Sequence, residues 1–334
     1  KQYPKALEYY QQALKVIELI PNPLGERRVL NNIGSAYEEL QQYSEALAYY
    51  QQVLSINRKL RDRAQEGTIL MKIAEMYVRL EKISDALKTD EQALAIMQEV
   101  GQRTQELSLL DRVGTAYAFL GQYARALESH QKAMTIAKEI KDRQREGRLL
   151  SSIGQMYLIL GQNAEALEAY EQAQLIAKNI GDRAEESNII DQIGSVYSSQ
   201  KNYTKALEAY ERARAINREL GNLNNEDDYF ISVGSIYLFQ GQYLKALTAF
   251  EEALKLVRTN KNRALEASVL VQIGSAYREL GEYSKALESF QKSYEISKSI
   301  QTPILESVIL HFLGVVSSDL GRLAQSEKYL YESI

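Results

Sequence analysis

The sequence predicts an all-α protein, a right-handed superhelical solenoid of antiparallel helical hairpins. Two series with a 40-residue period predict this fold class. Glycine occupies one phase, with Ala74 as the exception, and tyrosine follows three residues later, with Ser317 as the exception. A fixed period marks one supersecondary unit that has been copied and stacked. The two series are Gly34, Gly114, Gly154, Gly194, Gly234, Gly274 and Gly314, and Tyr37, Tyr77, Tyr117, Tyr157, Tyr197, Tyr237 and Tyr277.

The first half of each unit has the spacing of an amphipathic helix. In the unit 103–142, apolar residues recur every three or four positions: Leu107, Leu110, Val113, Gly114, Tyr117 and Leu120. Gly121 is expected to end this helix as a left-handed C-cap, as are Gly161, Gly241, Gly281 and Gly321 in sister units. Expected N-caps open the units, except at Gln102: Asn22, Asp62, Asp142, Asp182, Asn222, Asn262 and Thr302. Pro23 and Pro303 follow, where a helix tolerates proline.

The second half of each unit predicts another helix of similar length, about 16–18 residues. Small residues share one phase, which lets the paired helices approach closely: Ala46, Ala86, Ala126, Ala166, Ala206, Ala246 and Ala286. Of the 23 tyrosines, 17 fall in three phases, which indicates a packing role.

We expect one solenoid over residues 1–334 without a linker. It would begin with the second helix of a partial unit, residues 1–20. Eight 40-residue units follow, the last incomplete: about 23–62, 63–102, 103–142, 143–182, 183–222, 223–262, 263–302 and 303–334. Both ends resemble interior parts of a unit, so we expect a fragment of a longer protein.

Composition disfavours several classes of function. The formal charge of −4 is spread among interspersed acids and bases, so we expect no nucleic-acid partner. No apolar run approaches the roughly 20 residues of a membrane span, so no membrane partner is expected. The absence of cysteine fits a cytoplasmic location and removes thiolate chemistry. We expect no cofactor, no metal site and no catalytic residue, and therefore no enzyme, because phosphate-loop and nucleophile motifs are missing.

Two kinds of residue have both a structural and a functional interpretation. His130 occupies a phase shared with Tyr50 and Tyr170, so we expect a packed imidazole, whereas His311 is expected to face the groove. Arginine and glutamate recur three residues apart at the start of first helices, as in Arg63 and Glu66 or Arg183 and Glu186. We interpret these pairs as surface or inter-unit salt bridges worth a few tenths of a kcal/mol; a charged ligand ladder is the alternative.

The repeat resembles the tetratricopeptide repeat. The residues that carry the resemblance in one unit are Leu150, Ile153, Gly154, Tyr157, Leu160, Gly161, Ala166, Leu167, Tyr170 and Ala173. Leucine, isoleucine or Phe230 replaces the family's tryptophan, and the long period is similar to that of kinesin light chains, Pins-type adaptors and bacterial CHAT-protease arrays. The chaperone-binding carboxylate clamp is not matched, so no chaperone C-terminus is expected as ligand.

In stacked hairpins the first helices line the concave side, so residues beside the core Ile/Val–Gly pair are expected to face a groove. While packing phases stay nearly constant, these positions vary in chemistry. The candidate peptide-binding residues are Asn31, Ser35, Met71, Glu75, Asp111, Thr115, Ser151, Gln155, Asp191, Ser195, Ile231, Ser235, Leu238, Val271, Ser275 and His311. We expect Ile231, Leu238 and Val271 to form an apolar anchor for a ligand side chain.

The function expected from these observations is that of a scaffold or adaptor that binds a protein or peptide segment in the groove. The alternative is the sensory or regulatory arm of a larger protein, such as a CHAT-type protease or a transcription regulator.

Overall fold

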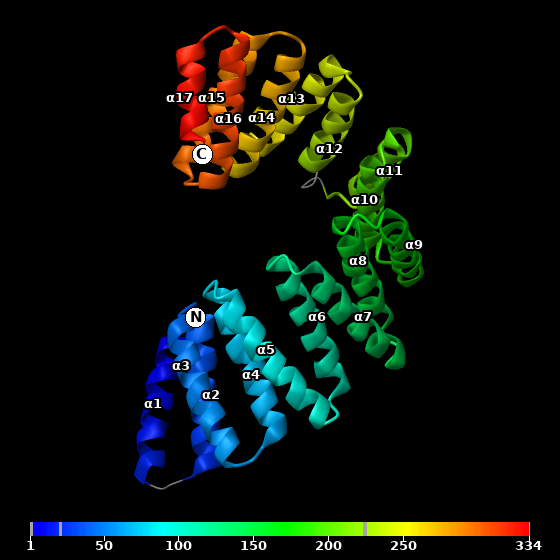
Figure 1. Ribbon diagram of the computed structural model, residues 1–334. Helices are drawn as coiled ribbons and strands as arrows, with labels where there is room; N and C mark the ends of the chain where they lie inside the picture. The colour runs from blue at the N-terminus through cyan, green and yellow to red at the C-terminus, as the bar shows by residue number, and fades with distance from the viewer. Residues whose placement is uncertain (1–2, 20–21, 223–225, 334) are drawn as a thin grey trace. The chain divides into compact units, whose positions relative to one another are not determined.

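The computed structural model describes residues 3–19, 22–222 and 226–333, and within this part it contains helices and no strands (Figure 1). The chain forms two compact units that meet in sequence at Ile176 and Ala177. Each unit consists of successive antiparallel helices that pack as hairpins, so the predicted all-α solenoid of hairpins is confirmed (Figure 1).

The first unit contains α1 to α8 and most of α9. Their bounds are α1 Tyr3–Leu19, α2 Pro23–Glu39, α3 Tyr43–Lys59, α4 Arg63–Arg79, α5 Ile83–Glu99, α6 Arg103–Phe119, α7 Tyr123–Glu139, α8 Arg143–Ile159 and α9 Asn163–Ile180. The second unit contains the end of α9 and α10 Arg183–Ser199, α11 Tyr203–Glu219, α12 Glu226–Phe239, α13 Tyr243–Thr259, α14 Arg263–Glu279, α15 Tyr283–Ser299, α16 Pro303–Asp319 and α17 Leu323–Glu332.

Most predicted N-caps are confirmed, because the cap side chain accepts a hydrogen bond from a backbone N–H three residues later. This holds for Asn22, Asp62, Asp142, Asp182 and Asn262. The prediction is wrong for Thr302, whose hydroxyl donates instead to the carbonyl of Ser297 at 3.2 Å. The prediction at Asn222 concerns a helix start within residues 223–225, which lie outside the described residues; α12 is described from Glu226.

The predicted glycine C-caps are also confirmed, with φ between 72° and 76° at Gly121, Gly161, Gly241, Gly281 and Gly321. Gln41, Glu81 and Lys201 adopt the same left-handed conformation at the equivalent turns of other units, with φ of 58–59°. The tight turn is therefore imposed by the hairpin, and glycine only lowers its conformational cost.

A glycine on the first helix and a ring on the second form the contact at the centre of a hairpin. A Cβ added to Gly34 would lie 2.6 Å from Cε1 of Tyr50, which is closer than real Cβ contacts. The same contact joins Gly154 to Tyr170, Gly194 to Tyr210, Gly234 to Phe250 and Gly274 to Phe290. Tyr50, Tyr170, Phe250 and Phe290 are fully buried, and the alanines of the series from Ala46 to Ala286 are at most 2% exposed. The predicted packing roles are confirmed.

His130 takes the place of the ring opposite Gly114 and is 2% exposed, as predicted for a packed imidazole. Its Nδ1 lies 3.2 Å from Oδ1 of Asp111. Histidine in place of tyrosine therefore keeps the shape of the hairpin core and adds a contact to Asp111 on the first helix of the same hairpin.

Of the surface and inter-unit salt bridges expected for the Arg–Glu pairs, the inter-unit form is the one found at Glu66 and Glu266, whose carboxylates are buried. Glu66, Glu106, Glu146, Glu186 and Glu266 are only 4–6% exposed. Arg63 Nη1 lies 2.7 Å from Glu66 Oε2, and Arg58 of the preceding helix lies 2.9 Å from Oε1. Burial alone would raise the pKa of Glu66, but hydrogen bonds from Arg58 and Arg63 outweigh it and hold the pKa below its usual range. Arg258 of the preceding hairpin binds Glu266 in the same way, and Gln98 donates a hydrogen bond to Glu106, so these three glutamates connect consecutive hairpins.

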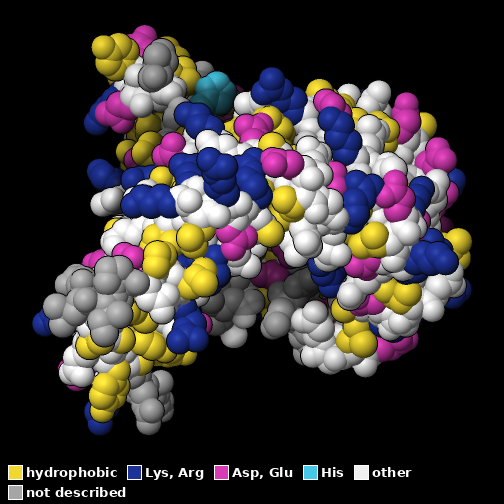
Figure 2. Space-filling view, turned by 90° about the horizontal axis from the view of Figure 1, so that it is seen from below, with side chains coloured by type: hydrophobic (Ala, Val, Ile, Leu, Met, Phe, Trp, Pro, Cys, Tyr) yellow, Lys and Arg dark blue, Asp and Glu magenta, His cyan; other side chains and the backbone are white. Residues whose placement is uncertain are grey.

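Acidic and basic side chains are interspersed over most of the face seen in Figure 2, in keeping with the small net charge. Within the described residues, no helix combines the length and the apolar character that crossing a membrane requires.

Candidate functional site

The predicted groove residues lie on first helices, from Asn31 and Ser35 on α2 to His311 on α16. Asp111, Thr115, Gln155 and His311 are exposed, and the other twelve are half-buried. All of them remain at least partly reachable by a ligand.

Several polar groove residues are already engaged within their own hairpin. The hydroxyls of Ser235 and Ser275 donate to the carbonyls of Ile231 and Val271, at 2.8 and 2.9 Å. Ser35 lies 3.1 Å from the hydroxyl of Tyr50, which donates to Glu38 at 2.6 Å. The ring hydroxyls of second helices therefore extend to the first-helix face, which the sequence patterns did not indicate.

The structure separates the three residues of the predicted apolar anchor between two core clusters. Ile231 and Leu238 pack against the cluster around Phe250. Val271 packs against the next cluster, around Phe290. Much of the apolar surface of these three side chains is thus buried against the core. That they anchor a ligand side chain remains a prediction.

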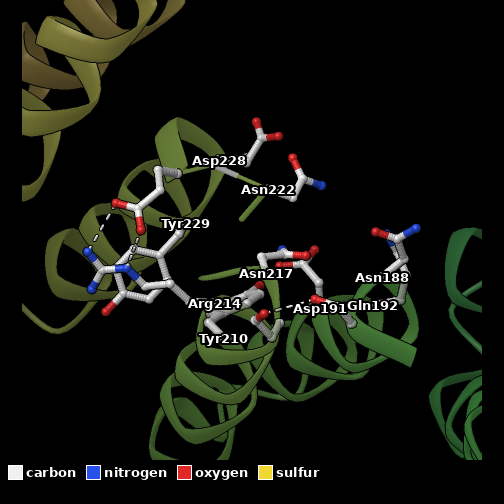
Figure 3. A pocket seen from close by; sticks show the side chains of 12 residues that line it. Asn188, Asp191, Gln192, Tyr210, Arg214, Asn217, Asn222, Asp228 and Tyr229 are labelled. Carbon is white, nitrogen blue, oxygen red and sulfur yellow. Dashed lines mark hydrogen bonds and ion pairs between the residues drawn. The ribbon is translucent and has the colours of Figure 1, made fainter. Parts of the chain in front are cut away.

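A polar cavity of about 210 Å³ lies among α10, α11 and α12 (Figure 3). One predicted groove residue, Asp191, lines it from α10. The remaining lining includes residues that the sequence reasoning missed, on α11 and at the start of α12: Tyr210, Arg214, Asn217, Glu226, Asp228 and Tyr229 (Figure 3). The acidic run from Glu226 to Asp228, which has no counterpart in other units, was a sequence signal for this site.

Among the described residues that line this cavity, Arg214 is the one arginine, and its charge is already neutralised. Arg214 Nε lies 3.1 Å from Glu226 Oε1, and Arg218 Nε lies 2.6 Å from the same oxygen. Hydrogen bonds from these two arginines lower the pKa of Glu226 to about 2. The guanidinium carbon of Arg214 also lies 4.2 Å from the ring centre of Tyr229. Arg214 therefore organises the wall of the cavity.

The carboxylates of Asp191 and Asp228 lack the arginine partners that Glu226 has within the described residues. Burial and then repulsion by Asp228 raise the pKa of Asp191 to about 6. Burial and then Asp227 raise the pKa of Asp228. Within the described residues neither carboxylate forms an ion pair. An added positive charge would be favourable here, because it would offset the cost of burying a carboxylate.

We expect Asp191→Asn to be more stable than the wild type at pH 7–8 by roughly 1–3 kcal/mol, the equivalent of a shift of one to two pKa units. The folded-state pKa of Asp191 lies above its unfolded value, so the native state binds the proton more tightly. Asp191 therefore lowers stability as pH rises from about 4 to about 6. Urea melts from pH 4 to pH 8 measure the effect. Glu208→Gln, at an exposed position on α11, is the control; a less stable Asp191→Asn at pH 8 would contradict the prediction.

A family model described as tetratricopeptide repeat matches residues 1–59, 65–139, 145–219 and 230–299. No curated protein matches the sequence at a significant level.

Solved structures share the fold at low identity. A signal-transduction ATPase with numerous domains (STAND) and a tetratricopeptide repeat sensor, from Pyrococcus horikoshii, is similar with a TM-score of 0.65 and 17% identity, over 98% of this chain and 54% of that one. A Rap protein complexed with competence and sporulation factor has a TM-score of 0.55 and 16% identity, over 89% of this chain and 86% of that one. Kinesin light chain repeats from Podosopora anserina have a TM-score of 0.52 and 20% identity, over 60% and 99%.

At these identities, the similarity to solved structures concerns the fold alone. The family model, in contrast, covers most of the sequence and all but the last of the 40-residue units. It agrees with the Gly–ring contact and the helical hairpins observed in both units. The chain therefore belongs to the tetratricopeptide repeat family.

Proposed function

We propose that this array binds an extended segment of a partner protein along the face formed by its first helices. Tetratricopeptide folds generally serve as non-catalytic protein-interaction scaffolds, and family membership supports that class for this chain. The finer proposal concerns where the partner lies.

The observation that carries the proposal is the contrast between buried and reachable phases. The glycine, ring and alanine phases are nearly constant from unit to unit and buried. The positions that flank the core glycine on first helices are reachable and change from Asn31 through Asp191 to His311. A constant framework with a variable exposed face is the arrangement in which a repeat protein adapts to one partner.

The regulatory alternative is supported by one comparison. The ATPase from Pyrococcus horikoshii carries its tetratricopeptide repeat as a sensor, and this chain is similar to about half of that protein. Both functions use the same first-helix face. They differ in whether an effector domain in the same protein responds to binding.

Two glutamines offer a matched test of the binding face. Gln155 is exposed on the first helix α8, and Gln172 is exposed on the second helix α9. The wild type would be screened against immobilised 15-residue peptides, and the affinity of the best-bound peptides measured by fluorescence anisotropy for Gln155→Arg and Gln172→Arg. We expect Gln155→Arg to weaken peptides that contact the first unit by about tenfold, roughly 1.4 kcal/mol.

Gln172→Arg introduces the same bulk and charge and should leave affinity unchanged. Equal losses for both variants, or a loss confined to Gln172→Arg, would overturn the proposed face.

A further inference from the structure

Helix α5 departs from the repeat in a way that leaves space inside a hairpin. Second helices α1 to α15 carry an aromatic or histidine at one or both of two ring positions, Tyr43 and Tyr50 in α3, except α5. In α5 these positions are Ile83 and Asp90, and the facing glycine is replaced by Ala74. The Cβ of Ala74 occupies space that a ring would need, so the Ala74–Asp90 pair is a coupled exchange.

A cavity of about 610 Å³ opens at this point among α4, α5 and α6 of the first unit. Both exchanged residues of α5 line it. The other apolar walls are Val78, Ala86, Ala116 and Phe119, and the side chains of Val78 and Phe119 are 47% and 76% exposed at its rim. Loss of two rings has thus created a mostly apolar slot that reaches the first-helix face.

The polar end of the slot is a buried carboxylate with unused hydrogen-bonding capacity. Asp90 is 3% exposed, and its buried Oδ1 accepts no hydrogen bond within the described residues. Arg112 Nη2 lies 3.0 Å from this oxygen, but the same arginine also donates to the carbonyl of Met71 at 3.3 Å. Burial raises the pKa of Asp90 to about 6 in spite of the attraction of Arg112. One guanidinium does not offset the burial of this carboxylate.

The charges around the slot favour a further cation. Glu75 and Asp111 line it together with Asp90, against Arg79 and Arg112. Arg79 Nη2 lies 3.8 Å from Glu75 Oε1, and Asp111 Oδ1 lies 3.2 Å from His130 Nδ1. An acidic ligand would add repulsion beside three carboxylates, whereas a donor cation would supply the hydrogen bond that Asp90 Oδ1 lacks.

We propose that this slot binds a lysine or arginine side chain of the partner segment. The aliphatic stem packs on Val78, Ile83 and Phe119, and the cationic head reaches Asp90. The inference rests on the proposed binding function and names the side chain that one part of the groove selects.

The repeat itself provides the variant that closes the slot. Ala74→Gly combined with Asp90→Tyr restores the glycine–ring pair found at Gly34 and Tyr50. Lys72 Nζ, from the first helix of the next hairpin, lies 5.0 Å from the ring centre of Tyr50, and Arg112 holds the same place relative to position 90. The double variant is therefore expected to fold with an unchanged or higher melting temperature and with the slot filled.

The experiment measures binding of three labelled peptides by fluorescence anisotropy: (Gly-Ser-Lys-Ser)₄, the same peptide with norleucine in place of lysine, and the same peptide with glutamate. The wild type should prefer the lysine peptide to the norleucine peptide by about tenfold or more. Asp90→Asn should abolish that preference, and Ala74→Gly/Asp90→Tyr should lose binding of both peptides at this site. Asp85→Asn, exposed on the same helix, removes the same charge and should change nothing.

Equal weakening by Asp90→Asn and Asp85→Asn would mean general charge attraction and would overturn the inference. So would a lysine preference that survives slot closure. If library peptides still respond to Gln155→Arg while slot closure has no effect, the slot fails and the binding face stands; if no peptide binds at all, both proposals fail.

Discussion

Replacement of Gly194 by leucine is expected to destabilise the protein by roughly 1–3 kcal/mol or more, because the new side chain has no room at the centre of its hairpin. A Cβ alone would lie 2.7 Å from Cε1 of Tyr210, and the ring is itself 5% exposed and cannot move into solvent without opening the core. Urea melts followed by circular dichroism measure the loss.

Two further variants separate this effect from the mere addition of an apolar residue. Asn188→Leu adds the same side chain at an exposed position of α10 and should change stability by less than about 0.5 kcal/mol. Gly194→Ala with Tyr210→Asp copies the natural pair Ala74 and Asp90, and its cost should be smaller than the sum of the single changes. Additive costs would mean that glycine and ring are not in direct conflict.

The second large effect is expected at a buried glutamate. Glu266 is 5% exposed and its carboxylate lies 2.8 Å from Arg258 Nε and 2.6 Å from Arg263 Nη1. Arg258→Ala with Arg263→Ala leaves that charge buried without either partner, which should cost roughly 3 kcal/mol. The melting temperature should fall accordingly.

Replacing the buried carboxylate by a neutral amide tests the cause of this loss. Glu266→Gln added to the two arginine changes removes the uncompensated charge and should recover most of the stability, since an amide is less costly to bury than a carboxylate. Lys285→Ala, which breaks the exposed pair with Glu282 at 3.5 Å, should have little effect. Failure of Glu266→Gln to recover stability would assign the loss to the packing of the arginine stems instead.

The residue pattern alone determined the framework of this protein. Helix spacing, N-caps such as Asp142 and turns such as Gly121 depend on residues within a few positions of each other, so their signals are local and readable. The packing roles of Gly194 and Tyr210 could also be predicted, because the period repeats the same contact in each unit and makes it visible as a phase. The same regularity identified the first-helix face as the variable one.

Tertiary structure decided the burial and charge of individual residues. The sequence left open whether Glu266 and its equivalents lie at the surface or between units, because helix position does not reveal cover by a neighbouring hairpin. Asp191 became part of a cavity because α11 and α12 contribute its other walls, and Ile231 was partly withdrawn from the groove by the core around Phe250. The sequence shows that Asp90 stands where most other second helices have a ring, but it does not show the cavity that results. Whether a missing ring leaves a slot or lets its neighbours collapse depends on how three packed helices meet.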